Sequence, residues 1–140
     1  MSRIVLDTNS LIQCIPSRSK YRPVWDSYLN GENEFCISGA ILNEYEEIIE
    51  RLAGVKAAKI VVDLILNNHN TIFVYPSYYF EIIKVDPDDN KFVDCAIAAN
   101  AKCIVTSDHH FDIVKRCPFP KIEIITLDEF LKEIETRSFS

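Results

Sequence analysis

The sequence predicts an α/β fold in which helices cover both faces of a mainly parallel sheet. The alternation of two kinds of segment supports this class. Short apolar runs rich in β-branched residues alternate along the chain with longer segments of helical periodicity, and such alternation is typical of parallel sheets with helical crossovers. The chain has 140 residues, of which 48% are hydrophobic. A single domain spanning residues 1–140 is therefore expected to bury its own core.

The predicted strands are short and apolar. Residues 4–6 read Ile-Val-Leu and run into the polar stretch Asp7-Thr8-Asn9, as expected of a buried parallel strand that ends in a turn. Four further runs have the same character and are predicted to be strands: 35–38, 71–75, 103–106 and 122–126.

Helices are predicted between these strands. In the clearest one, apolar residues recur at helical spacing, and the last one opens on Thr126 and Glu129, which form a capping-box pattern. Trp25 and Tyr28 also share helical spacing. Residues 76–89 fit no single pattern and are left without an assignment. The predicted helices span 40–53, 55–66, about 90–101 and a final segment from residue 126.

The bulk composition excludes several function classes. A formal net charge of −6 opposes passive binding to nucleic acid. Five cysteines without a C-x-x-C pair favour neither disulfides nor a zinc site, so they are interpreted as reduced and mostly buried. No run approaches the ~20 apolar residues that cross a bilayer, and the first residues lack the pattern of a secretory signal. A cytoplasmic protein with no membrane contact is expected.

Two aspartates come just after predicted strands. Asp7 follows residues 4–6, and Asp108 follows 103–106 with one serine between. The carboxyl ends of parallel strands meet at one edge of a sheet, where ligand sites form, so both carboxylates are expected at that edge. The alternative is that each aspartate caps the next helix or forms an Asx turn.

Asp94 is the only charged residue in the segment 92–101. A helix that is apolar all round should be buried, and a buried ionised carboxylate is costly unless it is paired or coordinates a metal. Asp94 is therefore a candidate metal ligand. The alternatives are an ion pair with Arg3 or Arg51, or local exposure near the start of the helix.

Glu44 borders the apolar stripe of the predicted helix 40–53, one helical step from Ile41 and Ile48. Glu46 borders the opposite edge of the same stripe, so position alone does not single out Glu44. The alternative is that both belong to a solvated acidic face.

Carboxylates that meet at one sheet edge repel one another unless a cation neutralises them. Asp7, Glu44, Asp94 and Asp108 all lie at strand ends or early helical positions, so the topology allows them to converge. Oxygen ligands suit Mg²⁺ or Mn²⁺, and such an ion activates water and stabilises the charge that grows on a phosphate. The four acids thus predict a divalent-metal site for phosphodiester hydrolysis.

The sequence also resembles the PIN-domain nucleases, especially the VapC-like ribonuclease toxins of bacterial toxin-antitoxin pairs. The resemblance implies a three-layer α/β/α sandwich, cleavage of RNA that depends on Mg²⁺ or Mn²⁺, a homodimer, and a small antitoxin that blocks the site. Four segments carry it, in this order: 4–9, 38–44, 86–101 and 105–108.

Carried over residue by residue, the resemblance assigns the metal-binding and catalytic acids and two residues that orient them. Asn9 and Ser107 are expected to orient the cluster by hydrogen bonds. Asp89 is interpreted as the cap of the helix that follows it rather than as a further ligand. The acids themselves are Asp7, Glu44, Asp94 and Asp108.

Two other features near these motifs are interpreted without the resemblance. The pair His109-His110 is interpreted as part of an ordinary loop rather than as zinc ligands, because no cysteine or histidine stands at ligand spacing. The segment 75–85 matches no motif and is a candidate for substrate or partner contacts.

Three functions remain open at this point. The main hypothesis is a cytoplasmic, metal-dependent endoribonuclease that acts as the toxin of a toxin-antitoxin pair. The second is a non-catalytic module of the same fold whose acidic cleft binds an arginine-bearing partner peptide. The third is an aspartyl phosphatase, which is disfavoured because Asn9 stands where those enzymes place their second aspartate.

Overall fold

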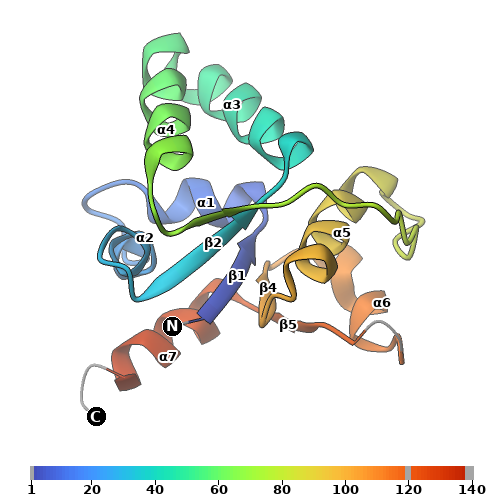
Figure 1. The fold of residues 1–140 in the computed structure, drawn as a ribbon. Coiled ribbons are helices and arrows are strands. Elements are labelled where there is room, and N and C mark those ends of the chain that lie inside the picture. The colour runs from blue at the N-terminus through green and yellow to red at the C-terminus, as the bar shows by residue number, and fades with distance from the viewer. Residues whose placement is uncertain (1, 119–120, 138–140) are drawn as a thin grey trace.

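The computed structural model describes residues 2–118 and 121–137, and its centre is a five-stranded parallel sheet (Figure 1). The strand order is β3-β2-β1-β4-β5, and every pairing is parallel. The predicted α/β class is therefore confirmed. The strands are β1 (Ser2–Leu6), β2 (Asn33–Ile37), β3 (Thr71–Phe73), β4 (Cys103–Val105) and β5 (Glu123–Ile125).

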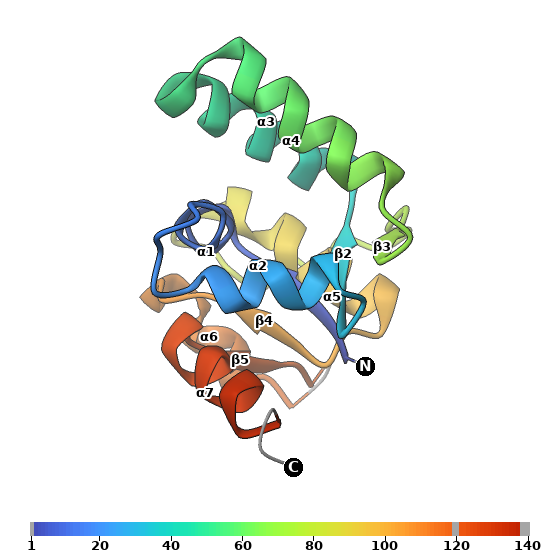
Figure 2. The ribbon, with the colours of Figure 1, turned by 90° about the vertical axis from the view of Figure 1, so that its left-hand side faces the viewer.

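Helices lie on both faces of this sheet. Figures 1 and 2 show α5 on one side and α1, α2 and α7 on the other. The four predicted helices are present, and α1, α2 and α6 complete the set in the described residues. The helices are α1 (Thr8–Cys14), α2 (Arg22–Leu29), α3 (Gly39–Ala53), α4 (Val55–Asn67), α5 (Asn90–Ala99), α6 (Asp112–Lys115) and α7 (Leu127–Arg137), with 3-10 turns η1 (Pro87–Asp89) and η2 (His109–Phe111).

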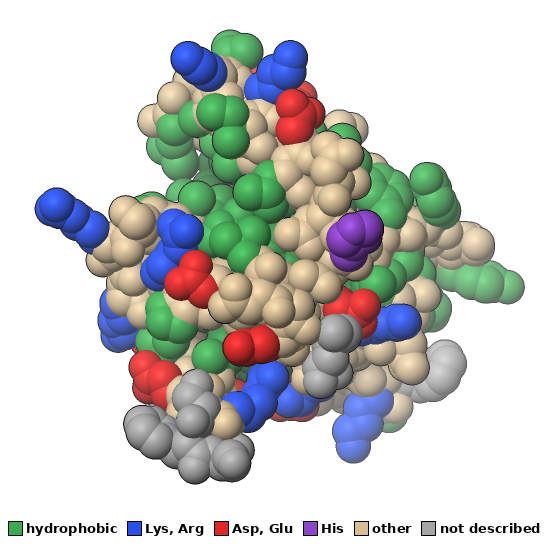
Figure 3. All heavy atoms as spheres, turned by 60° about the vertical axis from the view of Figure 1, so that its left-hand side comes forward, with side chains coloured by type: hydrophobic (Ala, Val, Ile, Leu, Met, Phe, Trp, Pro, Cys, Tyr) green, Lys and Arg blue, Asp and Glu red, His purple; other side chains and the backbone are tan. Residues whose placement is uncertain are grey.

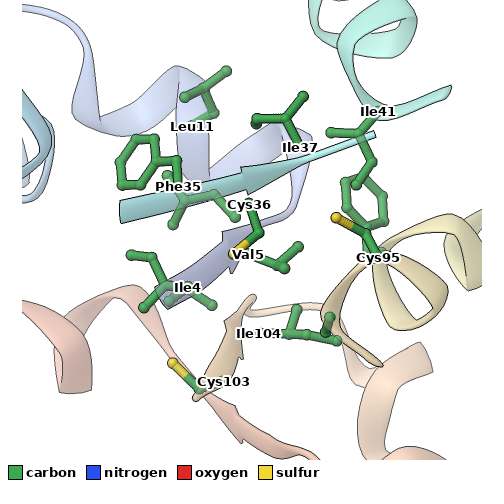
Figure 4. Packing of buried hydrophobic residues seen from close by; sticks show 14 of the residues in the cluster. Ile4, Val5, Leu11, Phe35, Cys36, Ile37, Ile41, Cys95, Cys103 and Ile104 are labelled. Carbon is green, nitrogen blue, oxygen red and sulfur yellow. The ribbon is translucent and has the colours of Figure 1, made fainter. Parts of the chain in front are cut away.

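The core is built on the two central strands. Ile4 and Val5 of β1 and Ile104 of β4 have no exposed surface (Figure 4), and each such side chain contributes about 1.5–3 kcal/mol when it leaves water. The ring of Phe35 on β2 stacks on the ring of Tyr28 on α2, with their centroids 4.1 Å apart. These contacts fix α2 against the sheet.

The cysteines agree with the prediction of buried thiols. Cys14, Cys36, Cys95 and Cys103 are buried without a disulfide, and Cys117 is partly buried. Burial raises the pKa of the Cys14 thiol to about 12, so it is protonated and unreactive at neutral pH.

A hairpin of α3 and α4 rises above the rest of the domain (Figure 2). Gly54 joins the two helices with a φ of 97°, a left-handed value that side chains disfavour. Figure 3 shows hydrophobic side chains on the face where this hairpin meets the body of the domain. None of the helices in the described residues is long and apolar enough to cross a membrane.

Candidate metal centre

Asp7 and Asp108 lie at the same edge of the sheet, as predicted. Asp7 follows β1 and Asp108 follows β4, and these two strands are neighbours whose register pairs Leu6 with Val105. The backbone N–H of Asp7 continues this ladder and donates to the Val105 carbonyl over 3.2 Å. Parallel pairing therefore brings the residues after both strands together.

The Asp7 carboxylate is almost completely buried, with 7% of the residue exposed. One oxygen, Oδ1, accepts from the backbone N–H of Ser10 over 2.8 Å and so caps α1. The other, Oδ2, accepts from the hydroxyl of Thr106 over 2.5 Å. Burial raises the pKa of Asp7 despite these hydrogen bonds, and the charge of Asp108 raises it further. Asp7 therefore caps α1, as the alternative interpretation predicted, and it also lies at the sheet edge.

Thr106 connects the two strand-end aspartates. Its hydroxyl donates to Asp7 and accepts from the backbone N–H of Asp108 over 3.0 Å. The Asp108 carboxylate in turn accepts from the backbone N–H of His110 over 2.9 Å, which caps η2. The threonine therefore holds both acids in place through a buried hydrogen-bond network.

The role of Thr106 is not predicted from the sequence, where Ser107 and Asn9 are the expected orienting residues. Both of those side chains are exposed, and their roles stay predictions. The missing signal was the strand register. Once Leu6 is known to pair with Val105, Asp7 must lie beside Thr106, but the sequence alone does not give that pairing.

Glu44 reaches the same edge from α3, which is capped by Ser38 at its first turn. The Thr8 hydroxyl, next to Asp7, donates to Glu44 Oε2, so the carboxylate is tied to the end of β1. Glu46 is exposed, whereas Glu44 is partly buried. The ambiguity between these two glutamates is resolved in favour of Glu44.

A lysine from α5 also enters this region. Lys91 Nζ lies 2.6 Å from Glu44 Oε1 and 2.9 Å from Asp88 Oδ2, and 15% of its side chain is exposed. Burial alone would lower the pKa of Lys91, but the two carboxylates outweigh it and raise the pKa. Lys91 is therefore a fixed positive charge inside the acidic region, and no sequence pattern predicts it.

Asp89 belongs to the acidic region rather than to the helix it precedes. It occupies the cap position of α5 but makes no side-chain capping hydrogen bond, so the predicted capping role was wrong. Its Oδ2 lies 3.3 Å from Nδ1 of His110. Burial raises the pKa of Asp89 to about 6, with the charges of Asp86 and Asp108 adding to the effect.

His110 joins these acids, contrary to the interpretation of an ordinary loop histidine. Its Nδ1 lies 3.4 Å from Asp108 Oδ1 as well as close to Asp89. Candidate ligand atoms of Asp86, Asp89 and His110 lie within 4.8 Å of one another, which is close enough to hold one metal ion. Asp89 thus connects to Asp108 through His110, and Asp108 connects to Asp7 through Thr106.

Asp94 is buried, as predicted, with 5% of the residue exposed. Its partner is neither Arg3 nor Arg51. Its Oδ1 accepts from the backbone N–H of Phe80 over 3.0 Å, while Arg3 pairs with Glu34 and Arg51 with Glu47. Burial raises the pKa of Asp94, and the nearby charge of Glu81 adds to the rise. No ion pair neutralises Asp94 among the described residues.

Asp94 and Asn90 together hold the segment 74–86 against α5. One turn before Asp94, the Asn90 amide accepts from Ile83 N–H and donates to Ile83 C=O, each over 2.8 Å. Residues i and i+4 of a helix lie on one face, so both side chains can form hydrogen bonds with the same stretch of backbone. The role of Asp94 as a metal ligand stays a prediction, and its observed contact is with this segment.

The acids at the sheet edge fit a hard divalent cation. Asp7, Asp89 and Asp108 offer carboxylate oxygens, which Mg²⁺ and Mn²⁺ prefer. The pKa of Asp89 is raised mainly by burial, and the charges of Asp86 and Asp108 add to the rise, so the ionised side chain is costly without a cation beside it. A cation bound there would remove that repulsion.

Comparison with known proteins agrees with this geometry. A family model described as a PIN domain matches residues 3–110. No curated protein sequence matches. Among solved structures, VapBC2 from Rickettsia felis, bound to a DNA fragment from its promoter, is 20% identical with a TM-score of 0.62, covering 89% of this chain and 98% of that chain.

Two further structures are similar over comparable lengths. VapBC-1 from nontypeable Haemophilus influenzae is 15% identical with a TM-score of 0.62, covering 90% of this chain and 98% of its own. DNA-bound VapBC from Salmonella typhimurium is 19% identical with a TM-score of 0.59, covering 91% and 99%. These likenesses confirm the predicted three-layer α/β/α fold.

Proposed function

This chain belongs to the PIN domain family, whose model spans residues 3–110, and on that premise we propose that it is a divalent-metal-dependent endoribonuclease that acts as the toxin of a toxin-antitoxin pair. The observation that supports the proposal most strongly is the connected series of side chains at the sheet edge. Asp7, Thr106, Asp108, His110 and Asp89 contact one another in that order.

The proposed ligands of Mg²⁺ or Mn²⁺ are Asp7, Glu44, Asp94 and Asp108. Asp89 is a further candidate, because its ligand oxygen lies within 4.8 Å of ligand atoms of Asp86 and His110. When bound, the metal supplies an activated water and neutralises charge on the scissile phosphate. The chain's own residues position the ligands: Thr106 fixes two aspartates, and Thr8 orients Glu44. Lys91 provides a second positive charge beside Glu44.

RNA cleavage by the purified protein tests this proposal. We expect cleavage of a single-stranded RNA in Mg²⁺ or Mn²⁺ and none in EDTA. Asp7→Asn and Asp108→Asn should each lower the rate at least 100-fold, because second-shell changes alone already cost roughly 10- to 100-fold. Asp112→Asn is the matched control, since Asp112 lies on α6 outside the acid series. Full activity in both site variants would rule out the assignment.

The proposed partner is a small antitoxin, and a homodimer is the proposed assembly. The similar structures are of VapBC complexes, which supports a search for a small open reading frame next to this one. Coexpression of the two products should yield a stable complex that no longer cleaves RNA. Light scattering of the isolated chain should give twice the mass of 16.1 kDa.

One observation favours a second function, a non-catalytic module that binds a cationic partner peptide. Lys91 already occupies Glu44 and Asp88, so the acidic region accepts a basic side chain. Titration calorimetry separates the two functions, because the module would bind an arginine-rich peptide without measurable binding of Mg²⁺ or Mn²⁺ and without nuclease activity.

A further inference from the structure

A large cleft lies beside the candidate metal centre, between the start of α3, the segment 74–86 and α5. Its volume is about 1090 Å³, at the upper end of the roughly 300–1,000 Å³ of small-molecule sites. Lys91 lines the cleft and also contacts Glu44, so the cleft opens directly onto the acidic region. Its other walls include Asn43, Tyr75, Tyr79 and Lys84.

Two tyrosines of this cleft are unusually exposed. Tyr75 is 84% exposed and Tyr79 is 74% exposed, although both line the cleft. The ring of Tyr75 is supported on one side by Phe73, with centroids 5.3 Å apart at a tilt of 49°. Large apolar rings that face an open cleft are available for a flat ligand to stack on.

The segment that carries these tyrosines is held in a defined position. The backbone of Phe80 and Ile83 is bonded to two buried side chains of α5, Asp94 and Asn90. The rings therefore project from an anchored backbone rather than from a loose loop, which lowers the entropy lost when a ligand binds.

The charges of the cleft favour a neutral flat ligand with donor groups over a phosphate. Glu81, Asp88 and Asp94 line it, against Lys84 and Lys91. Carboxylates repel phosphates but accept hydrogen bonds from the amino groups of bases, as acidic side chains do with cytosine. The phosphates would then lie toward Lys91 and the metal.

From this we propose that the cleft is a base-binding subsite in which unpaired nucleobases next to the scissile phosphate stack on Tyr75 and Tyr79. The proposal rests on the proposed nuclease function and adds to it the site that selects the RNA. Bases in a duplex are already stacked and cannot enter such a cleft, so the subsite requires a single strand. Asn43, whose amide can donate and accept, is placed to read a base edge.

The test measures binding of a fluorescent eight-nucleotide RNA by fluorescence anisotropy, in Mg²⁺ and in the Asp7→Asn background, which prevents cleavage. Tyr75→Leu and Tyr79→Leu should each weaken binding roughly 5- to 150-fold, the range that loss of stacking on one base gives. Tyr78→Leu is the matched control, because Tyr78 is 76% exposed in the same segment but does not line the cleft.

An RNA with abasic nucleotides provides the second arm. If the tyrosines bind bases, this RNA should bind weakly to the parent protein, and neither tyrosine substitution should weaken it further. Unchanged binding of the intact RNA by both variants would overturn the proposal. Equal losses for intact and abasic RNA would also overturn it, since the tyrosines would then act on the backbone or serve a protein partner.

The subsite and the nuclease function fail in different ways. A wild-type protein that binds intact RNA through Tyr75 and Tyr79 but does not cleave it in Mg²⁺ or Mn²⁺ supports the subsite and refutes the nuclease. A protein that cleaves RNA with the same KM in the wild type and in both tyrosine variants supports the nuclease and refutes the subsite.

Discussion

Replacement of Asp89 by asparagine should stabilise the metal-free protein at neutral pH. In the folded chain, burial and the charges of Asp86 and Asp108 raise the pKa of Asp89 from 3.8 to about 6. Each pKa unit corresponds to 1.36 kcal/mol, so ionising Asp89 costs the folded state about 3 kcal/mol relative to the unfolded chain. The side chain is only 17% exposed, and solvent screening therefore reduces this figure little.

The sign follows from proton binding. Between pH 4 and pH 6 the folded state keeps the Asp89 proton while the unfolded state has lost it, so the free energy of unfolding falls as the pH rises through this interval. Above pH 6 both states are ionised and the loss is complete. Asparagine does not titrate, so the free energy of unfolding of the Asp89→Asn variant should not show this decrease between pH 4 and pH 6.

Urea unfolding in EDTA at pH 4, 5, 6 and 8 measures the effect. We expect the wild type and Asp89→Asn to be similar at pH 4 and to differ by up to about 3 kcal/mol at pH 8, with the variant more stable. Mg²⁺ should stabilise the wild type more than the variant, because the variant lacks one of the candidate ligands. Asp112→Asn, a partly exposed acid on α6, is the control. Parallel pH profiles for the wild type and Asp89→Asn would refute the reasoning.

Three other substitutions separate the roles of neighbouring residues. Asp94→Asn keeps an acceptor for Phe80 N–H and should lose cleavage if Asp94 is a ligand as proposed, and full cleavage would refute that role. Asp94→Leu should also speed hydrogen exchange in the segment 74–86. Thr106→Val removes two hydrogen bonds and should lower cleavage roughly 10- to 100-fold. Thr136→Val, on the exposed face of α7, is the matched control, and equal effects of the two would refute the bridging role. Lys91→Gln leaves Glu44 without its cation and should lower the Tm of the metal-free protein. The rise in Tm that Mg²⁺ produces should become larger, because Lys91 no longer competes with the metal. An unchanged response to Mg²⁺ would contradict this competition.

The parts of the structure that depend on local pattern could be predicted from sequence. The apolar run before Asp7 and the run before Asp108 identified two neighbouring strand ends, because a buried parallel strand has a distinctive composition. The register that pairs Leu6 with Val105 is a long-range property, so the role of Thr106 was not predictable. The ion pair of Lys91 with Glu44 likewise joins residues from two helices that the sequence does not orient.

The contrast between Asp89 and Asp94 shows why burial alone does not identify the partners of a carboxylate. The apolar surroundings of Asp94 correctly predicted that it is buried. Its hydrogen-bond partner, the backbone N–H of Phe80, offsets only part of the effect of burial on its pKa, and no local pattern reveals that partner. The two residues are five positions apart, and a helical rise of about 1.5 Å per residue separates them by roughly 7.5 Å along the axis.

Ligand oxygens of one Mg²⁺ lie about 2.1 Å from the ion and thus no more than about 4 Å apart, so the two carboxylates would have to extend toward each other across this rise to share one ion. Asp89, at the end of α5 nearest to His110 and Asp108, is on the side where the other acids gather. Asp94 faces the segment that carries Tyr79 and Phe80. The start of α5 therefore faces the acidic region around His110, and its next turn holds the segment that lines the cleft.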